Sequence, residues 1–165
     1  MARLTEETQI AVGFVPSDLA AAAQSGDWVS LKNYDHVAIV LSKAAGAVGE
    51  IPTITVQQAQ DVAGTGAKGL NFTRIDVKNG ADLFAIGQFT KVTQAAASTY
   101  AIAAGNTQVL YVIEFDAQEL DKANGFDCIR ATFNDVGVTA QLGAVIYILS
   151  GARYAGQYPP SAIVD

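Results

Sequence analysis

Four carboxylates close together in the chain are its densest group of side chains with potential chemistry. They are Glu114, Asp116, Glu119 and Asp121. Two carboxylates held at a suitable separation can carry out glycoside hydrolysis as an acid with a base or nucleophile. An acidic cluster at a strand end is more often only solvated, and no aromatic platform for a sugar accompanies this one. We therefore predict no catalytic residues here and expect that the chain is not an enzyme.

The segment Gly64–Gly69 (GTGAKG) matches the GxGxxG pattern of dinucleotide-binding loops. In those loops the glycines let the backbone approach a pyrophosphate at the N-terminus of the helix that follows. Here the next residues, LNFT, alternate like a strand, and the segment lacks the Gly-Lys-Ser/Thr ending of a P-loop. The segment is therefore interpreted as a turn between strands, and no cofactor is expected.

The chain contains one histidine and one cysteine, His36 and Cys128. This pair is too small for the usual His/Cys metal sites, and a single cysteine excludes an intrachain disulfide. No nucleophile motif accompanies His36, so a hydrogen-bonded structural role is expected. Cys128 lies within a predicted strand, where an inert buried thiol is the usual outcome. No metal site is predicted.

The composition indicates assembly and disfavours two classes of partner. Charged residues make up 16% of the chain, against about 25% in typical globular domains, and half of the residues are hydrophobic. Buried subunit interfaces would explain such a deficit, because their cores are depleted of charge. The alternative is a monomer whose surface is covered by Ala, Gly, Thr, Gln and Asn. The net charge is −6 and the ten basic residues are scattered, which disfavours nucleic acid. The longest apolar run, Leu142–Leu149, is too short for a bilayer, and the start MARLTEETQ resembles no secretory signal, so synthesis in the cytoplasm is expected.

Residues 107–154 predict three strands joined by polar turns, and the rest of the chain is organised around them. In the first strand, Val109, Tyr111 and Ile113 share one apolar face, because side chains alternate along a strand. The third strand, residues 140–150, is apolar on both faces and therefore needs cover on both. We expect that cover from a second sheet and from another subunit.

Short strands recur along the chain at intervals of about ten residues, with Gly and Asn turns between them. This spacing predicts an all-β fold, an antiparallel jelly-roll-like β-sandwich of two four-stranded sheets. Opposite parities at Leu70 and Ile75 predict a β-bulge near Thr73. Residues 83–92 are expected to form one or two strands. The sandwich domain spans 27–165 and ends in an extended C-terminal tail.

Residues 1–26 differ from the rest and predict an extended N-terminal arm followed by a short helix. Ile10, Val12 and Phe14 alternate up to Pro16, and the alanines before Gly26 favour one or two helical turns. An arm of this kind would reach a neighbouring subunit. The alternative is an edge strand on the chain's own sheet.

Three segments carry a resemblance to a known group of proteins: 60–68 (QDVAGTGAK), 119–128 (ELDKANGFDC) and 140–154, with AQLGAV and LSGARY. From Trp28 onward the chain resembles small structural proteins of tailed bacteriophages, in particular capsid decoration or cement proteins. The resemblance implies a β-sandwich subunit on the surface of the virion. Its implied partners are itself, as a homodimer or homotrimer, and the major capsid protein.

The leading hypothesis is therefore a capsid cement protein that binds and stabilises the assembled head shell. The residues expected to make subunit or shell contacts are Ile10, Val12, Phe14, Tyr154 and Tyr158. A phage tail or baseplate structural protein shares every compositional feature. A carbohydrate-binding β-sandwich module is the third hypothesis, and its candidate aromatic residues are Trp28 and the C-terminal tyrosines.

Overall fold

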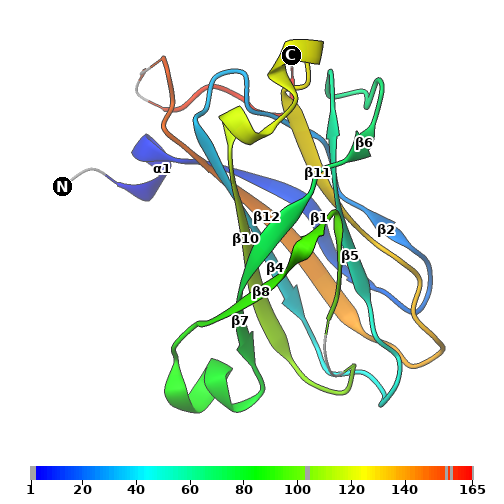
Figure 1. The fold of residues 1–165 in the computed structure, drawn as a ribbon. Helices are drawn as coiled ribbons and strands as arrows, with labels where there is room; N and C mark the ends of the chain where they lie inside the picture. Colours follow the sequence, from blue (N-terminus) through cyan, green and yellow to red (C-terminus); the bar gives the residue numbers. More distant parts are fainter. Residues whose placement is uncertain (1–2, 103–104, 155, 157, 165) are drawn as a thin grey trace.

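The structure, a computed structural model, describes residues 3–102, 105–154, 156 and 158–164. These residues form two antiparallel β-sheets packed face to face (Figure 1). Sheet A contains, in spatial order, β1 (Gln9–Asp18), β12 (Leu142–Ser150), β4 (His36–Lys43), β10 (Val109–Asp116), β7 (Phe72–Asn79) and β8 (Thr90–Ala97). Sheet B contains β2 (Gln24–Ser25), β11 (Cys128–Phe133), β5 (Thr53–Ala59) and β6 (Lys68–Gly69), while β3 (Val29–Ser30) also pairs with β11 and β9 (Thr99–Ala101) with β5.

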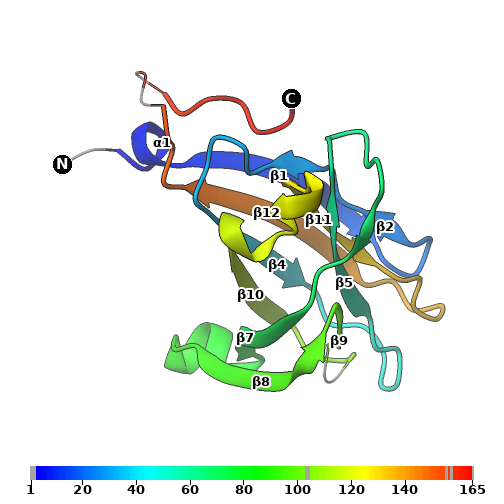
Figure 2. The same cartoon turned by 45° about the horizontal axis from the view of Figure 1, so that its top comes forward.

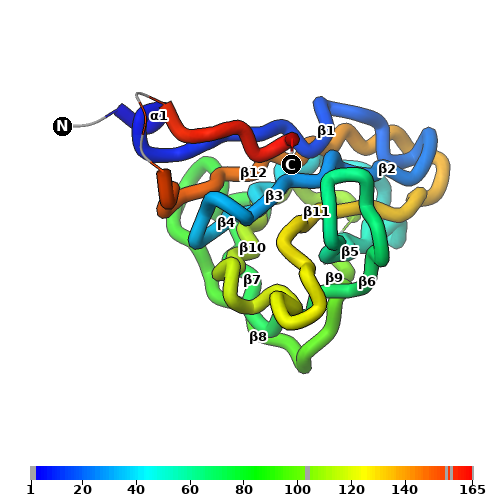
Figure 3. Tube along the Cα trace, turned by 90° about the horizontal axis from the view of Figure 1, so that it is seen from above, coloured from blue at the N-terminus to red at the C-terminus, as the bar shows by residue number. Residues whose placement is uncertain are grey.

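Short helical segments precede β1 or connect later strands. They are α1 (Leu4–Glu7), the π-helix η1 (Asp82–Ile86), and the 3₁₀ turns η2 (Ala117–Glu119) and η3 (Lys122–Asn124). None of the helices in the described part of the chain is long and apolar enough to cross a membrane. Residues 158–164 run beside β1 (Figures 2 and 3), where the Gln9 side chain donates to the Pro160 carbonyl.

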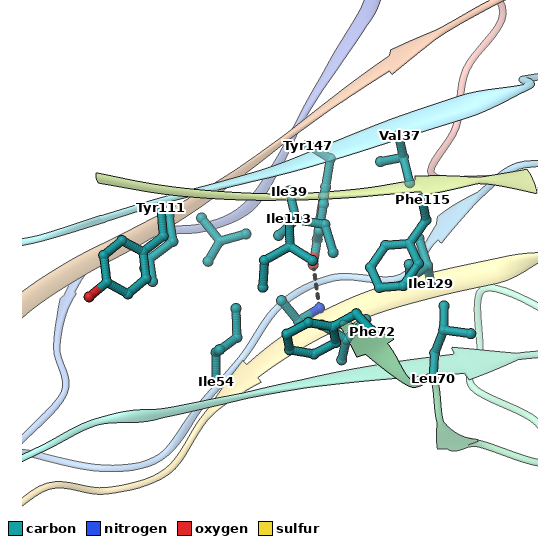
Figure 4. Close-up of a cluster of buried hydrophobic side chains, with 14 of the residues drawn as sticks. Val37, Ile39, Ile54, Leu70, Phe72, Tyr111, Ile113, Phe115, Ile129 and Tyr147 are labelled. Atoms are coloured by element: carbon teal, nitrogen blue, oxygen red, sulfur yellow. Dashed lines mark hydrogen bonds between the residues drawn. The ribbon is translucent and has the colours of Figure 1, made fainter. Parts of the chain in front are cut away.

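The core lies between the two sheets, because each long strand turns every second side chain inward. Figure 4 shows Ile113 and Phe115 of β10 facing Ile54 and Ile129 of sheet B. Phe115 meets Phe72 edge to face, with ring centroids 6.2 Å apart. These buried rings and branched side chains make one continuous core. The residues of sheet A that alternate with them therefore point away from sheet B.

One hydrogen bond ties the sheets together through the core. The Ala131 N–H of β11 donates to the Tyr147 hydroxyl of β12 at 2.9 Å (Figure 4). The hydroxyl lies beside Gly26, which belongs to the connection between β2 and β3. A Cβ on Gly26 would lie 2.5 Å from that hydroxyl oxygen, so only glycine fits there.

A buried cation holds the loops at the far end of β4. Lys43 is 2% exposed and donates to the carbonyls of Ala44 and Gly105 and to the Gln141 side chain. Its three donors are thereby satisfied. Burial lowers the pKa of the Lys43 ammonium.

The structure corrects the expected N-terminal arm. Gln9–Asp18 is β1, an edge strand paired antiparallel with β12, which was the alternative considered above. The edge of β12 needs a partner, and Leu19 is fully buried, so this segment belongs to the sandwich rather than preceding it. The expected short helix is wrong as well, because β1 extends to Asp18 and turns follow it.

Other sequence predictions have mixed outcomes. The all-β antiparallel class is confirmed, and the bulge appears as a register shift between Phe72 and Arg74. The jelly roll of two four-stranded sheets is not confirmed, since each sheet has six strands. Residues 82–86 form a π-helix instead of a strand, so only Thr90–Val92 of the expected 83–92 strand region is extended. Hydrophobicity without a clean period could not distinguish these two outcomes.

Candidate binding surface

The outer face of sheet A carries a continuous group of apolar side chains. Residues of its strands that do not face sheet B point outward. On β1, β12, β4 and β10 most outward residues are apolar, and we call this set the apolar face: Ile10, Val12, Ala38, Val40, Leu110, Val112, Leu142, Ala144, Ile146 and Ile148.

The strand register brings these residues into contact distance across four strands. Val12 lies opposite Ile146, which lies opposite Val40. Val40 in turn lies opposite Val112, so this row has no charged side chain. Neighbouring strands are about 4.8 Å apart, which allows branched side chains in such a row to touch.

No segment of the described chain covers the apolar face. Val12 is 50% exposed, Ile146 40% and Leu142 54%, while the central residues are half-buried by their neighbours. Four strands and seven residues make a face of about 19 by 20 Å, or about 400 Å². Apolar patches of about 300–600 Å² are the largest on typical monomers and are often functional.

Charged side chains border the apolar face on the side of β7. Arg74 forms an ion pair with Asp76 at 2.9 Å, and this contact raises the pKa of the Arg74 guanidinium. Phe89 lies beside them with the Lys78 ammonium 4.4 Å from its ring centre. A hollow of about 250 Å³ between Phe89, Val112 and these charges joins the rim to the apolar face.

Three members of the acidic cluster, Glu114, Asp116 and Glu119, line a cleft of about 400 Å³ at the end of β10. Glu119 accepts a hydrogen bond from the Asp116 N–H at 2.7 Å, which is part of the capping box at the start of η2. The Nε2 of His36 lies 3.9 Å from Glu114. Asp121 lies apart and pairs with Lys68, which lowers the pKa of its carboxyl group. No group of three ligands for a metal occurs among the described residues.

The glycine-rich segment is a turn between β5 and β6, as predicted. Gly64 and Gly66 have φ of +86° and +66°, and the Asp61 carboxylate accepts hydrogen bonds from the Ala63 and Thr65 N–H groups. A strand follows, and no helix N-terminus meets the glycines. The turn encloses one edge of Trp28, which is 8% exposed.

The burial of Trp28 removes one candidate of the carbohydrate hypothesis. The Arg130 guanidinium lies 4.5 Å from the centre of its ring. A buried ring with a cation beside it offers no open platform for a sugar. The remaining candidates are Tyr154 and Tyr158, which are 72% and 62% exposed.

The structure separates the five predicted contact residues. Ile10 and Val12 lie on the apolar face, whereas Phe14 turns inward and meets Phe133 edge to face, with ring centroids 5.9 Å apart. A register shift between Val12 and Phe14 reverses the side-chain direction, as a bulge does. Tyr154 and Tyr158 lie in the tail after β12.

Sequence reasoning missed most of the apolar face. Val40, Val112 and Ile146 lie on strands whose apolar character was noted, but their proximity depends on the strand order. The available signal was the two-sided apolar pattern of residues 140–150, which predicted cover on both sides. Sheet B covers only the inner side.

Comparisons with known proteins give one structural likeness. No family model and no curated protein matches the sequence. Among solved structures, the crystal structure of the SPBc2 prophage-derived protein YomS is similar, with a TM-score of 0.48 and 10% sequence identity. The alignment covers 87% of this chain and 94% of that one. A likeness at this level leaves the function to be argued from the residues of the chain itself.

Proposed function

We propose that this chain is a non-enzymatic structural protein of a tailed-phage particle, a cement subunit that binds and stabilises the assembled head shell. The observation that carries the proposal is the amount of exposed apolar surface on the β-sandwich, which comprises the apolar face and the exposed side chains Phe84, Ile86, Tyr154 and Tyr158. The resemblance of residues 60–68, 119–128 and 140–154 to phage decoration proteins supports it. So does the low share of charged residues, 16% of the chain.

A cement role requires contact surfaces and no reacting groups. Large exposed apolar side chains also occur away from the apolar face, at the β7–β8 connection with Phe84 and Ile86 and in the tail with Tyr154 and Tyr158. Aromatic side chains are enriched at interfaces, where they bury large areas. A ligand that binds only the assembled shell stabilises the assembled state by mass action. We assign the shell contact to these two exposed segments.

Co-sedimentation tests the proposal with shells that lack this protein. The expected result is saturable binding at a fixed ratio to the major capsid protein, together with shells that withstand a higher temperature. The double variant Tyr154→Ala/Tyr158→Ala should bind at least tenfold more weakly, while Val48→Ala, which truncates another exposed apolar residue, should bind like the wild type. Absence of binding to shells, or binding to tails only, would overturn the cement role.

A further inference from the structure

We propose that a second copy of this chain covers the apolar face, so that the protein is a twofold dimer in which two A sheets stack face to face. The inference deepens the proposed function by naming the partner of one surface of the same subunit. Its evidence is the layout of that surface, and it does not depend on where the protein is located in a particle.

The first argument is self-complementarity. In a twofold dimer the same patch of both subunits forms the interface. A charged side chain within the patch would therefore be buried against the apolar patch of the second subunit. The central row Val12–Ile146–Val40–Val112 contains no charge, so stacking buries no ion in that row. The outward carboxylate of β10, Glu114, lies outside the row, opposite Ala38. Sheets stack about 10 Å apart through apolar side chains of this size.

The second argument is the layout of polar groups around that row. Arg74, Asp76 and Lys78 lie on β7, beside the apolar centre, and include both signs of charge. Phe89 borders the centre on the same side. An apolar centre with a polar rim that contains an arginine is the usual anatomy of a protein–protein interface. A second copy of the chain carries the same apolar centre and polar rim, and it can therefore serve as the partner.

The third argument is area. The apolar face alone measures about 400 Å², and the outer surfaces of β7 and β8 extend sheet A to about 600 Å². A standard interface buries about 800 Å² on each partner, and smaller ones form weak complexes. The outer face of sheet A is therefore large enough for a dimer whose population depends on protein concentration.

Sedimentation equilibrium of the purified full chain over a wide range of concentrations tests this inference. The wild type should approach twice the chain mass of 17.2 kDa as the concentration rises. Val12→Lys places a charge in the central row and should weaken association at least tenfold. The matched control Val138→Lys changes a residue that is 93% exposed and outside the apolar face, and it should associate like the wild type.

Ile146→Gln provides a second variant in the same row, with a side chain of similar size and no charge. Thermal unfolding of each variant shows whether the subunit remains folded. A wild type that stays monomeric at every concentration would overturn the inference, as would folded variants that associate as strongly as the wild type.

The two proposals fail in distinguishable ways. A monomer that still binds shells would overturn the dimer and leave the cement role in place, with the shell protein as the cover of the apolar face. A dimer that binds no shell would support the sheet stacking and overturn the cement role.

Discussion

Tyr147 and Tyr111 are both buried in the core, but their hydroxyl groups differ. The Tyr147 hydroxyl accepts a hydrogen bond from the Ala131 N–H. The Tyr111 hydroxyl has no hydrogen-bond partner among the described residues. The Asn79 side chain lies close enough to lower the pKa of Tyr111, but its geometry with the hydroxyl is not that of a hydrogen bond.

This difference predicts that replacing each tyrosine by phenylalanine has a different effect on the free energy of unfolding. Tyr147→Phe leaves the Ala131 N–H unsatisfied in the core and should lower the free energy of unfolding by about 1–3 kcal/mol. Tyr111→Phe removes a hydroxyl that makes no hydrogen bond and should leave stability unchanged within about 0.5 kcal/mol or raise it. Urea unfolding measures both, and a greater loss for Tyr111→Phe would contradict the assignment of the cross-sheet bond.

The same tyrosines predict that stability falls in alkali. Burial raises the pKa of Tyr111 to about 12 and also raises the pKa of Tyr147. Above pH 10 the unfolded state releases these protons while the folded state retains them, so the free energy of unfolding decreases. Between pH 10 and 12 the loss from Tyr111 should be about 1 kcal/mol per pH unit. Tyr111→Phe should have a correspondingly shallower slope, and an unchanged slope would contradict the shift.

Gly49 is required for its backbone conformation alone, whereas Gly64 is required for its backbone conformation and for its close contact with Trp28. Both have positive φ, +86° and +87°. A Cβ at Gly64 would also lie 2.6 Å from the Trp28 Nε1, whereas Gly49 has nothing within 4 Å of that position. Gly49→Ala should cost about 1 kcal/mol of unfolding free energy from the backbone alone, and Gly64→Ala about 2–4 kcal/mol.

The fluorescence of Trp28, the single tryptophan of the chain, provides a direct reading of that contact. Its emission should shift in Gly64→Ala and stay unchanged in Gly49→Ala. Equal stability loss in the two variants, with no spectral difference, would show that the turn does not pack on Trp28.

At the scale of elements, we expect α1 to be dispensable for folding and β1 to be essential. The short helix α1 buries no residue, whereas β1 covers the edge of β12 and contributes Ala11 and Phe14 to the core. A chain that begins at Thr8 should keep its melting temperature within about 2 °C. A chain that begins at Leu19 should lose more than about 10 °C or fail to fold, because several buried side chains are lost together.

Thermal unfolding of the two truncated chains tests this division. A stable chain beginning at Leu19 would show that β1 is an arm after all. Deletion of residues 1–26 would remove an edge strand of the sandwich together with any shell contact, so a loss of shell binding in such a variant would not identify the contact.

Sequence reasoning recovered elements well where one face is apolar and the ends are marked. The first and third strands expected in residues 107–154 are β10 and β12, and β10 ends at Asp116 where η2 begins. It failed at β1, because a bulge after Val12 breaks the alternation that the prediction assumed. It also failed at η1, because a run such as LFAIG has no clear period.

At the scale of the whole molecule, strand order determines the surface, and strand order is not readable from one sequence. The apolar face joins residues from β1, β12, β4 and β10, and it brings together residues as far apart in the chain as Ile10 and Ile148, which are register partners. The sequence predicted that residues 140–150 need cover on both sides. The structure shows which side lacks it and which residues share that side.

Imaging of shells after incubation with the purified protein tests the central claim most directly. The proposed function predicts added density at symmetry axes of the shell, at a fixed number of copies per axis. The contact should involve the tail with Tyr154 and Tyr158. Shells without added density, under conditions where the protein is folded and in excess, would contradict the claim that this chain is a cement subunit.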